Sequence, residues 1–167
     1  MLDDNRGNMS RFNLILFALL ALVLVSAEVF AAGPEDILGS WYTKGRDARI
    51  EIYKCSTRYC GRISWLEEPM YPAGSKEGVP GTLKLDLNNP DPEMRKKPLV
   101  GSPILIDFVS AGDNLWTDGK IYNLEDGRTY RGRLTLTSYD QLNVRGFIGI
   151  PFLGGSTTWT RAKTGTK

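Results

Sequence analysis

Polar and apolar side chains alternate along the C-terminal part of the sequence, and no other feature limits the possible folds as strongly. In residues 128–136, Leu134 and Leu136 share one face of an extended chain, while Arg131 and Arg133 share the other. A period of two residues is typical of a β-strand with one buried and one solvated face. The alternation therefore predicts a sheet with an apolar inner side, as in the wall of a barrel.

The same pattern predicts about eight strands in the chain after residue 31. Turn signals separate them at the spacing of roughly 8 to 12 residues that all-β sandwiches and barrels show. Glycines within predicted strands, Gly119, Gly132 and Gly146, indicate the sharp bends that small closed barrels need. We therefore predict one all-β domain over residues 32–167, a small antiparallel barrel. The expected strands begin at Trp41 and continue at residues 49–54, 61–65, 103–108, 115–122, 128–136, 142–150 and 156–161.

One long segment, residues 67–100, interrupts this succession of strands. It contains six prolines, and Asp91 followed by Pro92 forms a helix-start signal. We expect an ordered loop excursion with one short helix, packed over the barrel or across its end.

Cys55 and Cys60 lie between two predicted strands and are separated by four residues. A four-residue turn would place them opposite each other in a hairpin, within the Cα separation that a disulfide tolerates. We predict a structural disulfide worth about 2 kcal/mol, because the loop it closes is short. A redox-active pair is the alternative, although such pairs usually have the closer Cys-x-x-Cys spacing.

The N-terminus has the pattern of a signal peptide. Arg11 precedes an apolar run of 12 residues, 14–25, and Val29 and Ala31 fit the small-residue pattern of a cleavage site. We expect a signal peptide over residues 1–31 with cleavage after Ala31, or after Ala27 as the second choice, and translation beginning at Met1 or Met9. The run is too short for a membrane span of about 20 residues, and no cysteine near the cleavage point offers a lipid anchor. The prediction is a periplasmic or secreted protein that is not a lipoprotein and has no membrane span after cleavage.

Composition argues against several kinds of function. The sequence has no histidine and only two cysteines, so we predict no metal site and no cofactor. Lys and Arg number 21 against 19 Asp and Glu, which is too balanced for a nucleic-acid partner. No motif that activates a serine is present. Asp107 and Asp118 are the best carboxylate pair for glycoside hydrolysis, but Asp118-Gly119 also fits a turn or bulge, and we predict no catalytic residues.

Several blocks of the sequence resemble a bacterial family known as domain of unknown function 2147. LGSWYT is similar to the opening of that family and DLNNPDPEMRKKPLVG to its middle segment. WTDGKIYNLEDGRTYRGRLTL and LNVRGFIGIPFLGGSTTWTR resemble its C-terminal half. The resemblance implies an exported protein with a calycin-like, lipocalin-like barrel, and it implies no established activity or catalytic residues.

Aromatic residues in the predicted strands are the candidates for a ligand site, because a barrel of eight strands either fills with side chains or holds one small ligand. They are Trp41, Trp65, Trp116, Tyr122, Tyr130 and Trp159. Our leading hypothesis is a non-enzymatic barrel that binds a small apolar or amphipathic ligand. The alternatives are core filling by these rings, and a cell-envelope interaction module, such as an inhibitor or assembly factor, that uses the 67–100 excursion. An enzyme ranks third.

Overall fold

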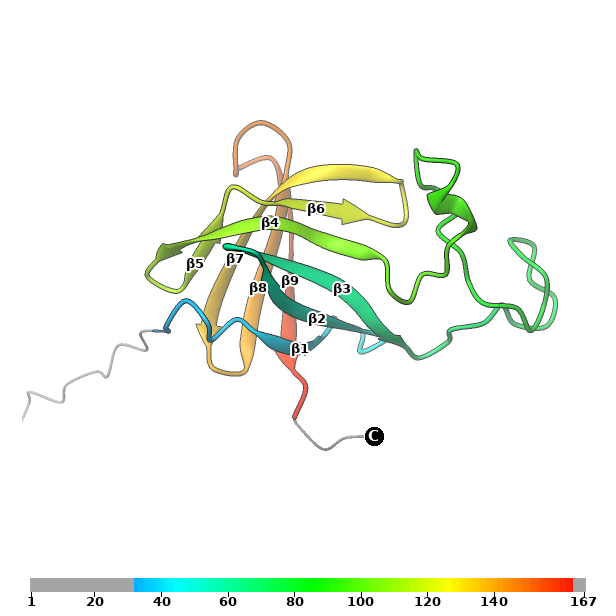
Figure 1. Ribbon diagram of the computed structural model, residues 1–167, viewed down its shortest axis with the longest axis horizontal. Coiled ribbons are helices and arrows are strands. Elements are labelled where there is room, and N and C mark those ends of the chain that lie inside the picture. The colour runs from blue at the N-terminus through cyan, green and yellow to red at the C-terminus, as the bar shows by residue number, and fades with distance from the viewer. Residues whose placement is uncertain (1–31, 164–167) are drawn as a thin grey trace, which may run out of the picture. The chain divides into compact units, whose positions relative to one another are not determined.

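Nine β-strands form one antiparallel sheet that closes on itself (Figure 1). The computed structural model describes residues 32–163. The strands are β1 (Gly39–Tyr42), β2 (Ala48–Cys55), β3 (Arg58–Leu66), β4 (Pro103–Gly112), β5 (Leu115–Thr117), β6 (Lys120–Asn123), β7 (Arg128–Ser138), β8 (Gln141–Phe147) and β9 (Gly154–Arg161). The order is β3-β2-β1-β9-β8-β7-β5-β4-β6, and pairing of β3 with β4 closes the ring. The prediction of an all-β barrel is confirmed.

Strands β5 and β6 occupy a single position in the barrel wall. Both pair with β4 on one side and with β7 on the other. The chain breaks between them at Asp118, whose φ of 59° lies in the left-handed region, so the strand expected over residues 115–122 is interrupted. Nine strands therefore fill eight positions, as expected from the sequence.

The two ends of the barrel differ. The loops β1–β2, β3–β4, β6–β7 and β8–β9 lie at one end, which we call the mouth, because the strands run antiparallel. The turns β2–β3, β4–β5 and β7–β8 lie at the other end, the base. Large buried side chains fill the interior towards the base, namely Ile37, Trp41, Tyr59, Phe108, Trp116, Leu134, Leu136 and Leu142.

Arg161 joins the N-terminal segment to the base. Its guanidinium carbon lies 4.1 Å from the centre of the Trp41 ring, and its three nitrogens donate to the carbonyl oxygens of residues 36, 38 and 139. The Trp41 indole N–H donates to the carbonyl oxygen of Ile37 over 2.9 Å. The half-buried Arg161 guanidinium and the buried Trp41 indole thus both have hydrogen-bond partners, which offsets the cost of removing these polar groups from water.

The Phe108 ring occupies space that two side chains would otherwise fill. A Cβ atom on Gly119 would lie 2.3 Å from this ring, and one on Gly132 would lie 2.4 Å from it. Gly146 differs, because a Cβ there would approach nothing closer than 3.6 Å. Glycines at the first two positions therefore let the wall close tightly around Phe108.

A disulfide joins Cys55 and Cys60 with a Cα separation of 5.8 Å, as predicted. The turn is shorter than expected, since β2 ends at Cys55 and β3 begins at Arg58. Cys55 pairs with Arg58 and Cys60 with Tyr53. The two cysteines are therefore diagonal neighbours on the outer face of the hairpin, not directly opposite residues.

The excursion of residues 67–100 projects as a set of loops beside the barrel, and the only helix in the described chain is the 3-10 helix η1 (Met94–Lys96) within it (Figure 1). The expected short helix is thus one 3-10 turn. It starts two residues later than expected, because Glu93 and not Asp91 is at the N-cap position. The Asp91 carboxylate accepts a hydrogen bond from the Glu93 N–H over 2.9 Å in the turn before it.

A buried carboxylate fixes the excursion to the mouth. Asp86 is only 2% exposed and accepts hydrogen bonds from the Tyr122 hydroxyl over 2.9 Å and from the Asn89 side-chain amide over 2.7 Å. Burial, followed by the hydrogen bond to Asp86, raises the pKa of Tyr122 to about 12. Tyr122 therefore stays protonated, and it donates, throughout the physiological range.

Replacing Tyr122 with phenylalanine should destabilise the protein by roughly 1–3 kcal/mol, because the Asp86 carboxylate would lose a donor while it stays buried. Chemical denaturation measures this change. Tyr53→Phe is the matched control, since the Tyr53 hydroxyl makes no hydrogen bond within residues 32–163. Equal stability of the two variants would contradict the anchoring role of Asp86.

The contrast between the wall glycines gives a second prediction. Gly132→Ala should cost roughly 1–3 kcal/mol through overpacking against Phe108, whereas Gly146→Ala should change stability by less than about 0.5 kcal/mol. Thermal or urea unfolding of the two variants tests this. Similar losses in both would show that Phe108 does not limit the closure of the wall.

Candidate functional site

A cavity of about 800 Å³ occupies the mouth half of the barrel. Residues of the β1–β2, β6–β7 and β8–β9 loops border it, and residues of β2, β3, β4, β6, β7, β8 and β9 form its wall. The interior is therefore divided, with the base filled by side chains and the mouth hollow. This division answers the question that the sequence left open.

The deep wall of the cavity is aliphatic. It is formed by inward-facing residues of the alternating strands, including Ile50, Ile63, Ile104 and Val144. Gly146 adds room, because it has no side chain where its strand passes the cavity. Such a wall favours the binding of apolar groups, because it removes their surface from water.

Polar groups lie at the rim. Asp47, Asn123, Glu125 and Ser156 border the opening, and the carboxylate side chains of Asp47 and Glu125 are exposed. No Lys or Arg side chain of residues 32–163 lines the cavity. The rim can therefore hydrogen-bond a polar end group at Asp47, Asn123 or Glu125, whereas the Ser156 hydroxyl already accepts a hydrogen bond from Arg145 over 2.8 Å.

Three of the six candidate aromatic residues line this cavity, namely Tyr122, Tyr130 and Trp159. Trp159 is also part of the core, so it lies at the boundary between the filled and the hollow halves. Trp41 and Trp116 are buried in the core and do not line the cavity.

Trp65, the sixth candidate, lies on the outer face. Its ring packs edge-on against Tyr42 at 6.1 Å, with the Arg49 guanidinium 5.4 Å from its centre. The cause is a register shift, in which Ile63 pairs with Ile50 but Trp65 pairs with Arg49, so that Ser64 is an extra residue. Such a bulge moves the following side chains to the other face, and Leu66 lines the cavity instead.

A hydrogen bond between two side chains at the mouth holds Tyr130. Its hydroxyl donates to the carboxylate of Asp126, and this contact raises the pKa of Tyr130 and lowers that of Asp126. The tyrosine therefore presents its ring to the cavity while its hydroxyl is engaged.

The sequence did not single out two residues of the β8–β9 loop, Ile148 and Leu153, which line the cavity at its border. The signal was present as a run of apolar residues, 147–153, around a turn. A loop of this composition is unusual, since turns are normally polar.

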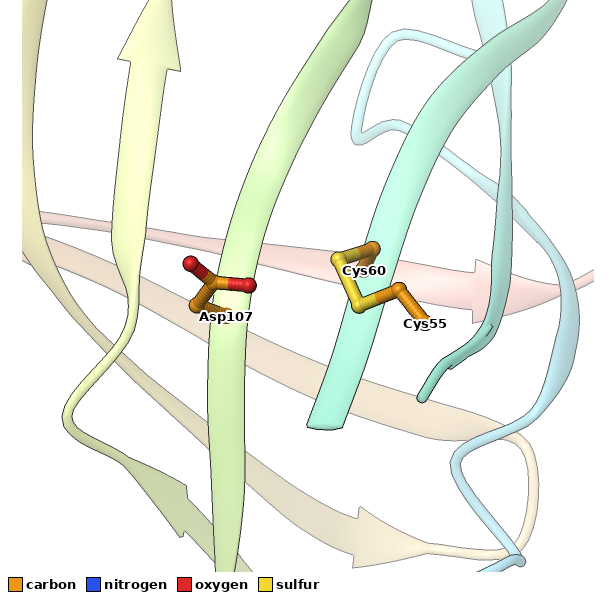
Figure 2. A group of neighbouring side chains, drawn as sticks. All are labelled: Cys55, Cys60 and Asp107. Atoms are coloured by element: carbon orange, nitrogen blue, oxygen red, sulfur yellow. A yellow bond between two sulfur atoms is a disulfide. The ribbon is translucent and has the colours of Figure 1, made fainter. Parts of the chain in front are cut away.

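The two aspartates considered above lie outside the cavity. Asp107 and Asp118 are both exposed, and neither lines the cavity. Figure 2 shows Asp107 beside the disulfide, with ligand atoms of Asp107, Cys55 and Cys60 within 4.8 Å of one another. Both sulfur atoms are bonded to each other, and a disulfide sulfur is not the thiolate that binds a metal.

No helix in the described part of the chain is both long and apolar enough to cross a membrane. The signal peptide predicted over residues 1–31, with its cleavage point, lies outside the described residues.

Comparison with known proteins places this barrel among others of the same architecture. A solved structure titled "Protein HP1028 from the human pathogen Helicobacter pylori belongs to the lipocalin family" is similar, with a TM-score of 0.61 and 22% sequence identity over 76% of this chain and 83% of the other. At this identity the similarity shows a shared lipocalin-like fold. The sequence matches no curated protein. The family model described as an uncharacterized protein conserved in bacteria, DUF2147, matches residues 39–161, and the chain belongs to this family.

Proposed function

We propose that this protein is a non-enzymatic carrier or sensor that binds one small apolar or amphipathic ligand in the mouth of its barrel. The observation that carries the proposal is the cavity of about 800 Å³ with an aliphatic wall and a polar rim. Small-molecule sites are typically concave, mostly apolar and roughly 300–1,000 Å³ in volume. The lipocalin-like fold supports the proposal but does not carry it, since one fold hosts many functions.

The arrangement of the wall favours one orientation of the ligand. Apolar parts would lie against Ile63 and Val144, and a polar end would lie at the rim near Asn123. Because Asp47 and Glu125 border the opening without a cation among the lining residues, a neutral or positively charged end group fits better than a carboxylate.

The proposed setting is an oxidising compartment outside the cytoplasm. The Cys55–Cys60 disulfide supports it, since such bonds persist mainly in exported proteins. The predicted signal peptide would deliver the chain there, as a periplasmic or secreted protein.

A second role as an interaction module rests on the excursion. Met70, Val79 and Leu83 expose about half or more of their surface there, and exposed apolar groups often mark protein contacts. This role does not compete with ligand binding for the same residues, because none of the three lines the cavity.

Filling the cavity should weaken binding of an apolar probe. N-phenyl-1-naphthylamine is neutral and becomes fluorescent in apolar surroundings, so its titration reports occupancy. Gly146→Leu would project a side chain into the cavity, and we expect the probe affinity to fall by at least roughly tenfold, because the aliphatic surface is no longer available to the probe.

Asn143→Leu is the matched control, because it adds the same side chain to the same strand on its outer face. Probe binding should be unchanged in this variant. Equal binding by wild type and Gly146→Leu, with both folded by circular dichroism, would contradict the proposed site.

A further inference from the structure

Packing of the barrel does not explain the apolar residues of the β8–β9 loop. Its apolar side chains point into solvent: Phe152 is 92% exposed and Ile150 is 60% exposed. Neither lines the cavity, although their neighbours Ile148 and Leu153 do. Exposed apolar clusters of this kind usually mark a surface that is covered by a partner.

Three arginines lie beside this loop on the outer face of β7 and β8. Arg131 donates to the carbonyl oxygen of Gly149 over 3.4 Å, and Arg145 donates to that of Pro151 over 2.7 Å. Arg133 is directly opposite Arg145 in the strand register. None of the three forms an ion pair with any residue in 32–163, and like charges directly opposite each other repel.

A depression of about 250 Å³ joins the arginines to the loop. Arg131, Arg133, Gly149 and Pro151 line it, together with one carboxylate, that of Asp118. Arg131 and Arg133 therefore bring two guanidinium groups to one depression. Two neighbouring guanidinium groups are suited to a phosphate oxygen.

The β8–β9 loop thus combines exposed apolar side chains with neighbouring arginine side chains. We propose that the β8–β9 loop inserts into the surface of an anionic phospholipid bilayer, with Phe152 and Ile150 among the acyl chains and Arg131 and Arg133 on lipid phosphates. Shallow insertion of apolar side chains together with basic side chains near the headgroups is how proteins bind membrane surfaces reversibly. The loop borders the cavity, so docking brings the mouth to the bilayer, from which an apolar ligand can enter without crossing water.

Co-sedimentation with vesicles tests the proposal. The full protein should bind vesicles of phosphatidylcholine with phosphatidylglycerol, and bind phosphatidylcholine alone more weakly. Ile150→Ser with Phe152→Ser should lower the partition coefficient by at least roughly tenfold, since two apolar side chains no longer leave water. Arg131→Gln should lower it by roughly fivefold, and only on the anionic vesicles.

Val79→Ser with Leu83→Ser is the control, because it removes two exposed apolar side chains from the excursion. It should bind vesicles like the wild type. Absence of wild-type binding to anionic vesicles, or equal binding by the Ile150 and Phe152 double variant, overturns the proposal. So does light scattering that shows a wild-type dimer and a monomeric double variant, because the loop would then join two copies of this chain.

Docking and ligand binding can fail separately. Ile150 and Phe152 lie outside the cavity lining, so the double variant should bind N-phenyl-1-naphthylamine like the wild type in the absence of vesicles. A loss of probe binding there would also contradict the proposal, since it would assign the loop to the cavity and not to a membrane.

Discussion

Closing a sheet of eight strand positions into a barrel fixes how much space each level of the interior offers to side chains. Towards the base, this chain fills that space with large rings, and Trp41, Trp116 and Phe108 are almost completely buried. Phe108 fits only because Gly119 and Gly132 have no side chains where the ring lies. Towards the mouth, the inward positions carry aliphatic residues and Gly146, and these leave the cavity open. The division of one interior into a packed and a hollow half is the constraint on which the rest of the molecule depends.

The strand pattern was readable from the sequence, because a period of two shows which side chains face inwards. It did not show at which level an inward ring lies, so Trp41 and Trp159 were indistinguishable although only Trp159 lines the cavity. Nor did it reveal the extra residue Ser64, which turns Trp65 outwards. Both depend on pairing between strands. The two-residue turn between β2 and β3 was likewise set by register and not by local composition. The break at Asp118 was signalled locally, because Asp118-Gly119 fits a turn or bulge.

Two loops shape the mouth, the 67–100 excursion and the β8–β9 loop. The excursion is anchored there by buried Asp86, whose partner Tyr122 belongs to the barrel wall. The β8–β9 loop brings apolar side chains to the border of the cavity and to the solvent beyond it. Arg131 and Arg145 hold the carbonyl groups of that loop, so its shape is fixed from the outer face of the barrel. At the base, Arg161 and Trp41 make a separate set of contacts with the N-terminal segment.

The central claim is that the interior is hollow at the mouth and packed at the base. Methyl NMR during a titration with N-phenyl-1-naphthylamine tests it most directly, because it reports each level of the interior separately. Methyl signals of Ile50, Ile63 and Val144, which line the cavity, should shift and saturate together, while those of Leu134, Leu136 and Leu142 in the packed core should stay in place. Shifts confined to exposed residues such as Ile150, or no shifts at all, would contradict the account.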